Sequence, residues 1–263
     1  MKKTKKKEID VLLSSVPRDG KGLFLSPHPD DIAFSIAETF SRCSSYGIAT
    51  RLLCVFSESA YTVKRDIPKN PDTVSILRLS EDKAFIRDMY PGCKYGRLGL
   101  KDSMLRSAPN KKFPRIRELA VQPNIDLIET VATKIKYRMC TADLIFCPLA
   151  IGDHTDHTLL REAVIRNIRL LQGTTVIFYE DLPYCSGIPD QEVRQLIYRM
   201  SFRLPNSMKH VLCRIQNMGE RLALCERYYP SQTNRGTLNK ISTHLNRTAR
   251  YPAERLWAVR IFE

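Results

Sequence analysis

Residues 22–45 read GLFLSPHPDDIAFSIAETFSRCSS, and this stretch decides the fold. Its opening run, 22–26, is short and apolar, as is typical of a buried strand. The segment 30–45 then places apolar residues at positions 33, 36, 37 and 40, which is helical spacing. A buried strand followed at once by an amphipathic helix is the repeating unit of an α/β fold, and here the turn between the two carries polar side chains.

The same alternation continues along the chain. Further apolar runs predict strands at 48–56, 95–100, 143–149, 174–179, 209–215 and 256–262, and amphipathic segments predict helices at 73–90, 125–140, 158–172, 191–202 and 217–228. Strands that are apolar throughout and alternate with helices are buried on both faces. The pattern therefore predicts a Rossmann-like three-layer α/β fold with a mostly parallel sheet. Residues 101–115, which are basic and contain two prolines, are expected to form a surface loop.

The composition is that of an ordinary globular domain. The chain has 263 residues, of which 43% are hydrophobic and 27% are charged. We expect residues 1–20 to be a basic, partly flexible N-terminal segment and residues 21–263 to be a single α/β domain. Within that domain, the core that carries the functional site is expected at 22–184, and 185–263 is expected to be a C-terminal elaboration. The polar, basic stretch 229–251 is assigned no element and no role.

Eight cysteines and an excess of basic residues indicate the cellular compartment and the kinds of partner to expect. No two cysteines are separated by two residues, and several lie in apolar runs, so they are predicted to be reduced core residues of a cytoplasmic protein. No apolar run approaches the ~20 residues that span a bilayer, so no transmembrane segment is expected. The formal net charge of +14 is compatible with a polyanion-binding protein or with an enzyme that acts on an anionic substrate.

Three polar clusters follow predicted strands, as PHPDD at 27–31, GDHTDH at 152–157 and EDLPY at 180–184. The carboxyl ends of parallel strands open onto one edge of a sheet, so these clusters are expected to converge there. They hold three of the five histidines in the chain. Imidazole nitrogens and a carboxylate oxygen suit zinc, and three such ligands leave one position for water. The clusters therefore predict a metal-dependent hydrolase, with a spare carboxylate as proton acceptor and a further histidine to stabilise an oxyanion.

The same motifs resemble those of the PIG-L-like (LmbE-like) family of N-acetylglucosaminide deacetylases. Residues 27–31 match the family motif Ala/Pro-His-Pro-Asp-Asp, and residues 154–157 match its second motif, His-Pro/Thr-Asp-His. The resemblance implies a Rossmann-like, deacetylase-like domain. It also implies a zinc-dependent hydrolase that removes the N-acetyl group from an amino sugar. Fe²⁺ or Co²⁺ could occupy the same ligand set as Zn²⁺.

Carried over by position, the resemblance implies roles for six side chains of the two motifs. The zinc ligands would be His28, Asp31 and His157. The general base would be Asp30, and His154 would polarise the substrate carbonyl or protonate the leaving amine. Asp156 would orient one of the histidine ligands.

Weaker matches to the family imply contacts with the substrate. These contacts would come from Ser35, Arg78, Asp102, Asp181 and Tyr184. Arg78 and Glu81 are three residues apart on a predicted helix, so a surface ion pair is an equally good interpretation of that match. The isolated histidines His210 and His244 are assigned no role.

The sequence leaves the sugar substrate open. The candidates are a nucleotide-linked N-acetylglucosamine, a glycolipid head group, a thiol-precursor glycoside and an N-acetylated aminoglycoside. For an aminoglycoside, the acids Asp102, Glu180 and Asp181 could bind amino groups, although the last two could equally be turn residues.

A function of another class also stays open, namely a basic polyanion-binding protein with a non-catalytic metal site. The complete set of motif residues argues against it, and no nucleic-acid partner is expected. A phosphoesterase is disfavoured because such enzymes usually hold two metal ions.

Overall fold

The computed structural model describes residues 7–106 and 124–261. Its strands are β1 (Lys7–Glu8), β2 (Lys21–Ser26), β3 (Ala49–Cys54), β4 (Lys94–Arg97), β5 (Leu144–Pro148), β6 (Thr175–Tyr179), β7 (Lys209–Arg214) and β8 (Ala253–Arg260). They form one eight-stranded sheet with the order β1-β7-β8-β6-β5-β2-β3-β4. The strands are parallel except that β8 runs antiparallel to both of its neighbours, β6 and β7. The predicted, mostly parallel sheet is therefore confirmed.

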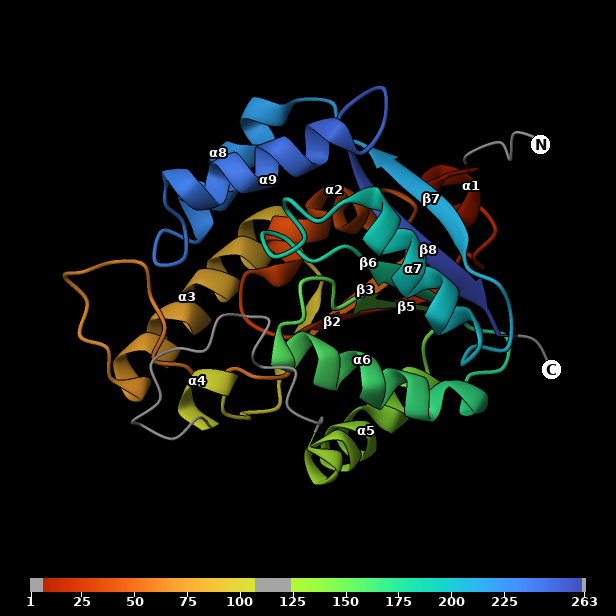
Figure 1. Ribbon diagram of the computed structural model, residues 1–263, viewed down its shortest axis with the longest axis horizontal. Coiled ribbons are helices and arrows are strands. Elements are labelled where there is room, and N and C mark those ends of the chain that lie inside the picture. The colour runs from red at the N-terminus through yellow and green to blue at the C-terminus, as the bar shows by residue number, and fades with distance from the viewer. Residues whose placement is uncertain (1–6, 107–123, 262–263) are drawn as a thin grey trace.

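Helices cover both faces of this sheet. They are α1 (Ile9–Leu13), α2 (Asp31–Ser45), α3 (Pro71–Met89), α4 (Ser103–Arg106), α5 (Ile125–Cys140), α6 (Thr155–Asn167), α7 (Asp190–Ser201), α8 (Met218–Tyr228) and α9 (Arg235–Arg247), with a 3-10 helix, η2, at Ile168–Leu170. Helices α2, α3, α8 and α9 lie on one side of the sheet, and α5 and α6 lie on the other (Figure 1). This arrangement confirms the three-layer α/β fold. Within the described part of the chain, no helix is both long and apolar enough to cross a membrane.

Aromatic packing fixes α2 on the sheet. The ring of Phe24 on β2 lies 4.1 Å from that of Phe146 on β5 and 4.4 Å from that of Phe40 on α2, measured between centroids. All three side chains are fully buried, which contributes several kcal/mol of hydrophobic stabilisation per aromatic ring removed from water. The start of α2, and the loop that precedes it, are thereby held in a fixed place above β2.

The strand order creates a crevice at the edge of the sheet. From β2 the chain proceeds outward to β3 and β4, whereas from β5 it proceeds in the opposite direction to β6. β2 and β5 are hydrogen-bonded neighbours, so the loops that follow them diverge to opposite faces. Ligands of open α/β sheets bind at such a switch point, beyond the carboxyl ends of the strands. Two of the three polar clusters in the sequence lie in these two loops.

The cysteines are free thiols, and six of the eight are buried. The prediction of reduced core cysteines is confirmed for those six. Cys93 is half-buried and Cys140 is exposed, so the prediction was wrong for Cys140. Cys140 is the last residue of α5, and its side chain is exposed there.

Three stretches add detail to the elements expected from the sequence. In the expected N-terminal segment 1–20, residues 9–13 form α1, whose Ile9 and Leu13 pack into the core, and residues 1–6 lie outside the described part of the chain. The stretch 229–251 contains α9, whose apolar positions 238, 241 and 245 lie on one face. The expected surface loop 101–115 begins with the buried Asp102 and the short helix α4, and its residues 107–115 lie outside the described part of the chain.

Candidate active site

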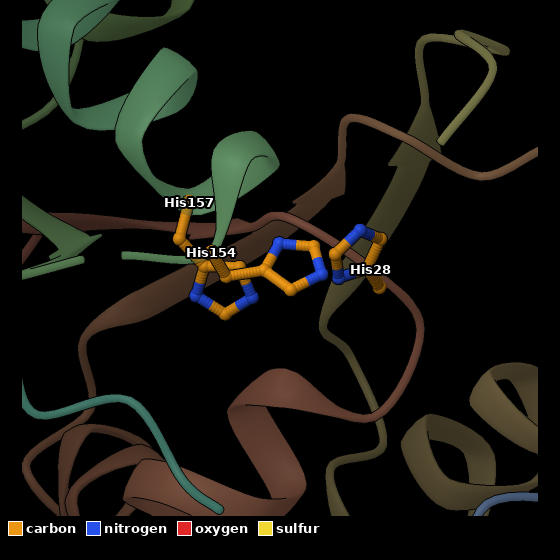
Figure 2. A group of neighbouring side chains, drawn as sticks. All are labelled: His28, His154 and His157. Carbon is orange, nitrogen blue, oxygen red and sulfur yellow. The ribbon is translucent and has the colours of Figure 1, made fainter. Parts of the chain in front are cut away.

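Three histidine rings converge at the switch point. His28 lies in the loop after β2, whereas His154 and His157 belong to the start of α6. Ring nitrogens of the three residues lie within 4.8 Å of one another. Figure 2 shows the rings side by side, with His28 approaching from the β2 loop and the other two from α6. The fold therefore brings the two sequence motifs together, as expected for a shared edge of the sheet.

A carboxylate sets the orientation of His157. Its Nδ1 lies 2.6 Å from Oδ1 of Asp181, so Nδ1 carries the proton and donates a hydrogen bond to the carboxylate. The other nitrogen, Nε2, is buried and has no hydrogen-bond partner among the described residues. A buried polar atom without a partner is costly in a native fold, and a metal ion would satisfy this one. The lone pair of Nε2 is thus available as a ligand.

His28 is oriented in the same way by a different carboxylate. Its Nε2 lies 2.8 Å from Oδ2 of Asp156, which leaves the lone pair on Nδ1. That Nδ1 lies 3.2 Å from Oδ2 of Asp31, and Oδ1 of Asp31 lies 3.4 Å from Nε2 of His157. Two imidazole lone pairs and one carboxylate therefore meet, which is the donor set typical of a catalytic zinc site.

The site is electrostatically suited to a cation. Burial disfavours the charged form of His28, but hydrogen bonds and charges from Asp156 and Asp31 raise the pKa of its imidazole to about 10. Burial alone would raise the pKa of Asp31, and the neighbouring His157 and His28 more than offset it, so the pKa is lowered. The carboxylates therefore stabilise positive charge at this point, whether a proton on Nδ1 of His28 carries it or a metal cation that replaces that proton.

Asp156 is itself held by a network. Its Oδ1 accepts a hydrogen bond from Nη2 of Arg106 at 2.5 Å, and its Oδ2 accepts one from the backbone N–H of Ser103 at 2.8 Å. Although burial opposes ionisation, the contact with His28 and the charge of Arg106 lower the pKa of Asp156. No motif or spacing in the sequence points to Arg106 as a partner of Asp156, because the two residues are 50 positions apart.

Asp30 directly precedes Asp31, and its carboxylate lies next to Arg78. The distance from Nη2 of Arg78 to Oδ2 of Asp30 is 3.4 Å, and the same Nη2 donates to the carbonyl of Pro29 at 2.9 Å. Burial raises the pKa of Asp30 well above its ordinary value, and the charge of Arg78 opposes this shift. Asp30 has a φ of 100°, an unfavourable conformation for a non-glycine residue that is concentrated at functional sites.

The interpretation of Arg78 and Glu81 as a surface ion pair was wrong. Both side chains are buried, and they contact different partners. Arg78 contacts the Asp30 loop, whereas Glu81 accepts hydrogen bonds from the backbone N–H and the hydroxyl of Ser231.

His154 presents a neutral imidazole to the same space. The backbone N–H of Asp156 donates to its Nδ1 at 3.3 Å, so Nε2 carries the proton. Burial and the neighbouring His157 and His28 lower the pKa of His154 well below its ordinary value. The ring of Tyr184 covers this side of the cluster, with centroid distances of 4.8 Å to His154 and 5.0 Å to His157.

Comparison with known families agrees with this geometry. Residues 23–168, just over half of the chain, match the family described as PIG-L, GlcNAc-PI de-N-acetylase. The chain belongs to this family. The matched region includes both loops of the switch point and the helices that follow them.

Two curated relatives of this PIG-L family member are 2'-N-acetylparomamine deacetylases. The one from Streptomyces fradiae is 34% identical over 173 residues, which cover 64% of this chain and 58% of that protein. The one from Niallia circulans is 28% identical over 186 residues, which cover 62% of this chain and 66% of that protein. In both cases the matched region spans less than two thirds of the relative's own length.

Two solved structures share the fold of this PIG-L family member. The zinc-inhibited form of teicoplanin deacetylase has a TM-score of 0.65 at 19% identity, covering 91% of this chain and 98% of that one. The N,N'-diacetylchitobiose deacetylase from Pyrococcus horikoshii has a TM-score of 0.58 at 15% identity, covering 91% and 83%. At these identities the likeness concerns the fold alone.

Three of the predicted substrate contacts of this family member have internal partners. The hydroxyl of Ser35 accepts a hydrogen bond from the backbone N–H of Leu182, and Asp102 accepts one from that of Leu105. Asp181 accepts one from the N–H of Ile151 in addition to its contact with His157. All three side chains are buried. Arg78 and Tyr184, by contrast, contact Asp30 and the histidine rings directly.

Glu180 and His244 form a second buried cluster. Nε2 of His244 lies 2.9 Å from Oε2 of Glu180, and Arg255 and Trp257 donate to Oε1 of the same carboxylate. Cys185 packs against the His244 ring. His244, to which the sequence assigned no role, thus ties α9 to the loop that carries Asp181. Glu180 is fully engaged in this network and does not face the histidine site.

We expect Asp181→Asn to lower the affinity for zinc about 10- to 100-fold, because the amide cannot hold the Nδ1 proton of His157 as the carboxylate does. A competition titration with a chromogenic chelator measures this affinity. Asp126→Asn on the surface of α5 is the matched control and should keep the wild-type value. Equal affinities for Asp181→Asn and wild type would show that Asp181 does not orient the ligand.

Proposed function

We propose that this protein is a metal-dependent hydrolase that removes the N-acetyl group from an amino sugar, with an N-acetylated aminoglycoside as the leading substrate. One observation carries the proposal. The buried Nε2 of His157 has no hydrogen-bond partner among residues 7–106 and 124–261, and it lies beside the Asp31 carboxylate, which also approaches Nδ1 of His28. This donor set stands at the switch point of a PIG-L family fold.

The metal would be held by His28, Asp31 and His157, and we propose zinc because imidazole and carboxylate are its usual ligands in hydrolases. Bound there, a divalent metal would lower the pKa of water toward ~7 and polarise the acetyl carbonyl. Fe²⁺ and Co²⁺ suit the same donors. Asp156 and Asp181 would keep the two histidines in the required tautomers.

Asp30 is the proposed general base. Its carboxylate is buried beside the ligand set, and burial moves its pKa upward toward the range in which it can accept a proton from the nucleophilic water. Arg78 keeps the carboxylate oriented and limits that upward shift. Asp30 is the N-cap residue of α2, but its side chain makes no capping hydrogen bond to the helix.

His154 is proposed to act on the carbonyl and then on the leaving group. Because Nδ1 accepts a hydrogen bond from the backbone, the Nε2–H of the neutral ring can donate to the developing oxyanion. The proton that Asp30 takes from water is available for the leaving nitrogen, which departs as an amine while the acetyl group becomes acetate. Tyr184, which packs on His154, would form part of the substrate pocket.

The relatives favour one substrate class. The two curated proteins are named for the deacetylation of 2'-N-acetylparomamine, an aminoglycoside intermediate. Among the candidates that the sequence leaves open, this similarity favours the N-acetylated aminoglycoside over a nucleotide sugar or a glycolipid. The net charge of +14 does not oppose it, because overall charge affects encounter rates and does not define a pocket.

The test is a substrate panel with zinc-loaded protein. Amine and acetate release would be measured for 2'-N-acetylparomamine, UDP-N-acetylglucosamine and a methyl N-acetylglucosaminide, each with and without a chelator. We expect stoichiometric amine and acetate from the first, with activity abolished by the chelator and restored by added zinc. Preferential hydrolysis of the nucleotide sugar would refute the substrate class, and release unaffected by the chelator would refute the metal mechanism.

A further inference from the structure

A cavity of about 290 Å³ has Tyr184 among its lining residues, and the ring of Tyr184 packs against His154 and His157 of the histidine cluster. One wall of the cavity is the loop 150–153, which follows β5 and leads directly into His154. The opposite wall is one face of α7. The side chains that this helix contributes are Glu192, Gln195, Leu196 and Arg199.

The polar side chains of the cavity have no partners in the described part of the chain. The side chains of Glu192, Gln195 and Arg199 are exposed, and their spacing places them on one face of α7. Among the described residues, no hydrogen bond or ion pair engages these three side chains. Asp153 of the loop is exposed in the same way. This contrasts with Asp102, which is buried and caps the backbone of Leu105. Asp153 and Glu192 thus line the cavity and form no ion pair with a described residue.

The loop wall is held in an unusual conformation. Ala150, Gly152 and Asp153 all have positive φ, at 57°, 90° and 59°. A Cβ on Gly152 would lie 2.9 Å from the backbone oxygen of Tyr184, so only glycine permits this close approach. A positive φ is energetically unfavourable for non-glycine residues such as Ala150 and Asp153. Such conformations persist where the surrounding structure holds them, and they are common at functional sites.

The same loop is coupled to the proposed metal ligands. The N–H of Ile151 donates to Oδ2 of Asp181 at 3.0 Å, while Oδ1 of Asp181 holds Nδ1 of His157. One carboxylate thus fixes both the cavity wall and a ligand. Asp181 therefore couples the position of the cavity wall to that of His157.

The chemistry of the lining fits a second sugar ring. Tyr184 and Leu196 offer apolar surface to the faces of a ring, and Gln195 and Arg199 can donate hydrogen bonds to hydroxyl groups. The carboxylates of Asp153 and Glu192 outnumber the one guanidinium, although the whole chain carries a net charge of +14. Unpaired carboxylates in such a cavity favour ammonium groups.

We propose that this cavity is a second-ring subsite that binds an amino-bearing sugar or aminocyclitol attached to the N-acetylated sugar, with Glu192 and Asp153 recognising its ammonium groups. This inference rests on the proposed deacetylase function and adds the part of the substrate that the metal site does not contact. It makes Glu192 and Asp153 specificity-determining residues.

The test compares kcat/KM for two substrates, 2'-N-acetylparomamine and methyl N-acetylglucosaminide, which lacks the second ring. We expect Glu192→Gln, and separately Asp153→Asn, to lower the ratio of the two-ring to the one-ring kcat/KM about tenfold, as the loss of one charge-assisted hydrogen bond predicts. Asparagine tolerates positive φ, so Asp153→Asn preserves the loop. Glu226→Gln on α8 removes the same charge away from the cavity and should leave the ratio at its wild-type value.

An unchanged ratio in both cavity variants would overturn the proposal, and so would an equal loss on both substrates, because that would indicate a general effect on the metal site. A second measurement separates this inference from the proposed function. Calorimetric binding of the free two-ring amine, paromamine, requires no hydrolysis. We expect about tenfold weaker binding by Glu192→Gln, and equal binding by wild type and this variant would refute the subsite even if no substrate is hydrolysed.

Discussion

Asp30→Asn is expected to lower kcat for amide hydrolysis about 100- to 10,000-fold, the range that a positioned general base contributes. Asparagine has nearly the same shape and tolerates the φ of 100° at this position, but it cannot accept a proton. The ligand set of His28, Asp31 and His157 stays complete, so zinc content should remain at the wild-type level. Steady-state kinetics together with metal analysis of the same sample measure both quantities.

Two comparisons make the Asp30 result specific. Asp19→Asn carries the same substitution on an exposed loop and should retain wild-type kcat. Because Arg78 loses its charged partner in Asp30→Asn, the unfolding temperature of this variant must also be recorded. A folded, zinc-loaded Asp30→Asn protein with a kcat within about tenfold of wild type would refute the base role, since general bases contribute more than that.

His157→Gln is expected to abolish specific zinc binding. Substitutions in residues that only orient a ligand already cost about 10- to 100-fold in affinity, and this change removes the ligand itself. At a zinc concentration about 100-fold above the wild-type Kd, binding stabilises the folded protein by ~2.7 kcal/mol. For a domain of this size, that corresponds to an increase of about 5–10 °C in unfolding temperature. We expect this zinc-dependent increase in wild type and none in His157→Gln.

The matched control is His210→Gln. His210 lies on β7 opposite Trp257, away from the switch point, so its substitution should preserve the zinc-dependent increase in unfolding temperature. Calorimetric titration of zinc into each protein gives the affinity independently of stability. If His157→Gln binds zinc as tightly as wild type, His157 is not a ligand and the proposed site is wrong.

The sequence by itself determined the architecture and supplied the residues that are proposed for the site. Apolar strands alternating with amphipathic helices are a local pattern, and the helix after β2 follows from the spacing of its apolar side chains. The placement of two histidine motifs directly after strands was sufficient to predict that they meet, because parallel strands share one edge. That the donors are imidazole nitrogens and a carboxylate oxygen also follows from the residue types alone.

Other features escaped local reasoning because their signals are weak. Helix α9 buries only Ile241, His244 and Leu245, so its polar sequence resembles a surface segment. Its place in the fold depends on Glu180, which lies 64 residues from His244. The end strand β8 begins at Ala253 and not at 256, because the polar Glu254 and Arg255 at its start find buried partners only in the folded protein.

Only the tertiary structure decided how the site residues are held. Nε2–H of His28 donates a hydrogen bond to Asp156, 128 residues away, and this leaves the lone pair on Nδ1. The corresponding acceptor for His157 is Asp181, 24 residues away. Arg78 reaches Asp30 across 48 residues and is thereby a partner of the proposed base. These contacts set tautomers and charges, which depend on distances between side chains and on their burial. The sequence specifies which groups are present. The folded sheet and its helices fix the distances between those groups and their burial, which determine how the groups ionise.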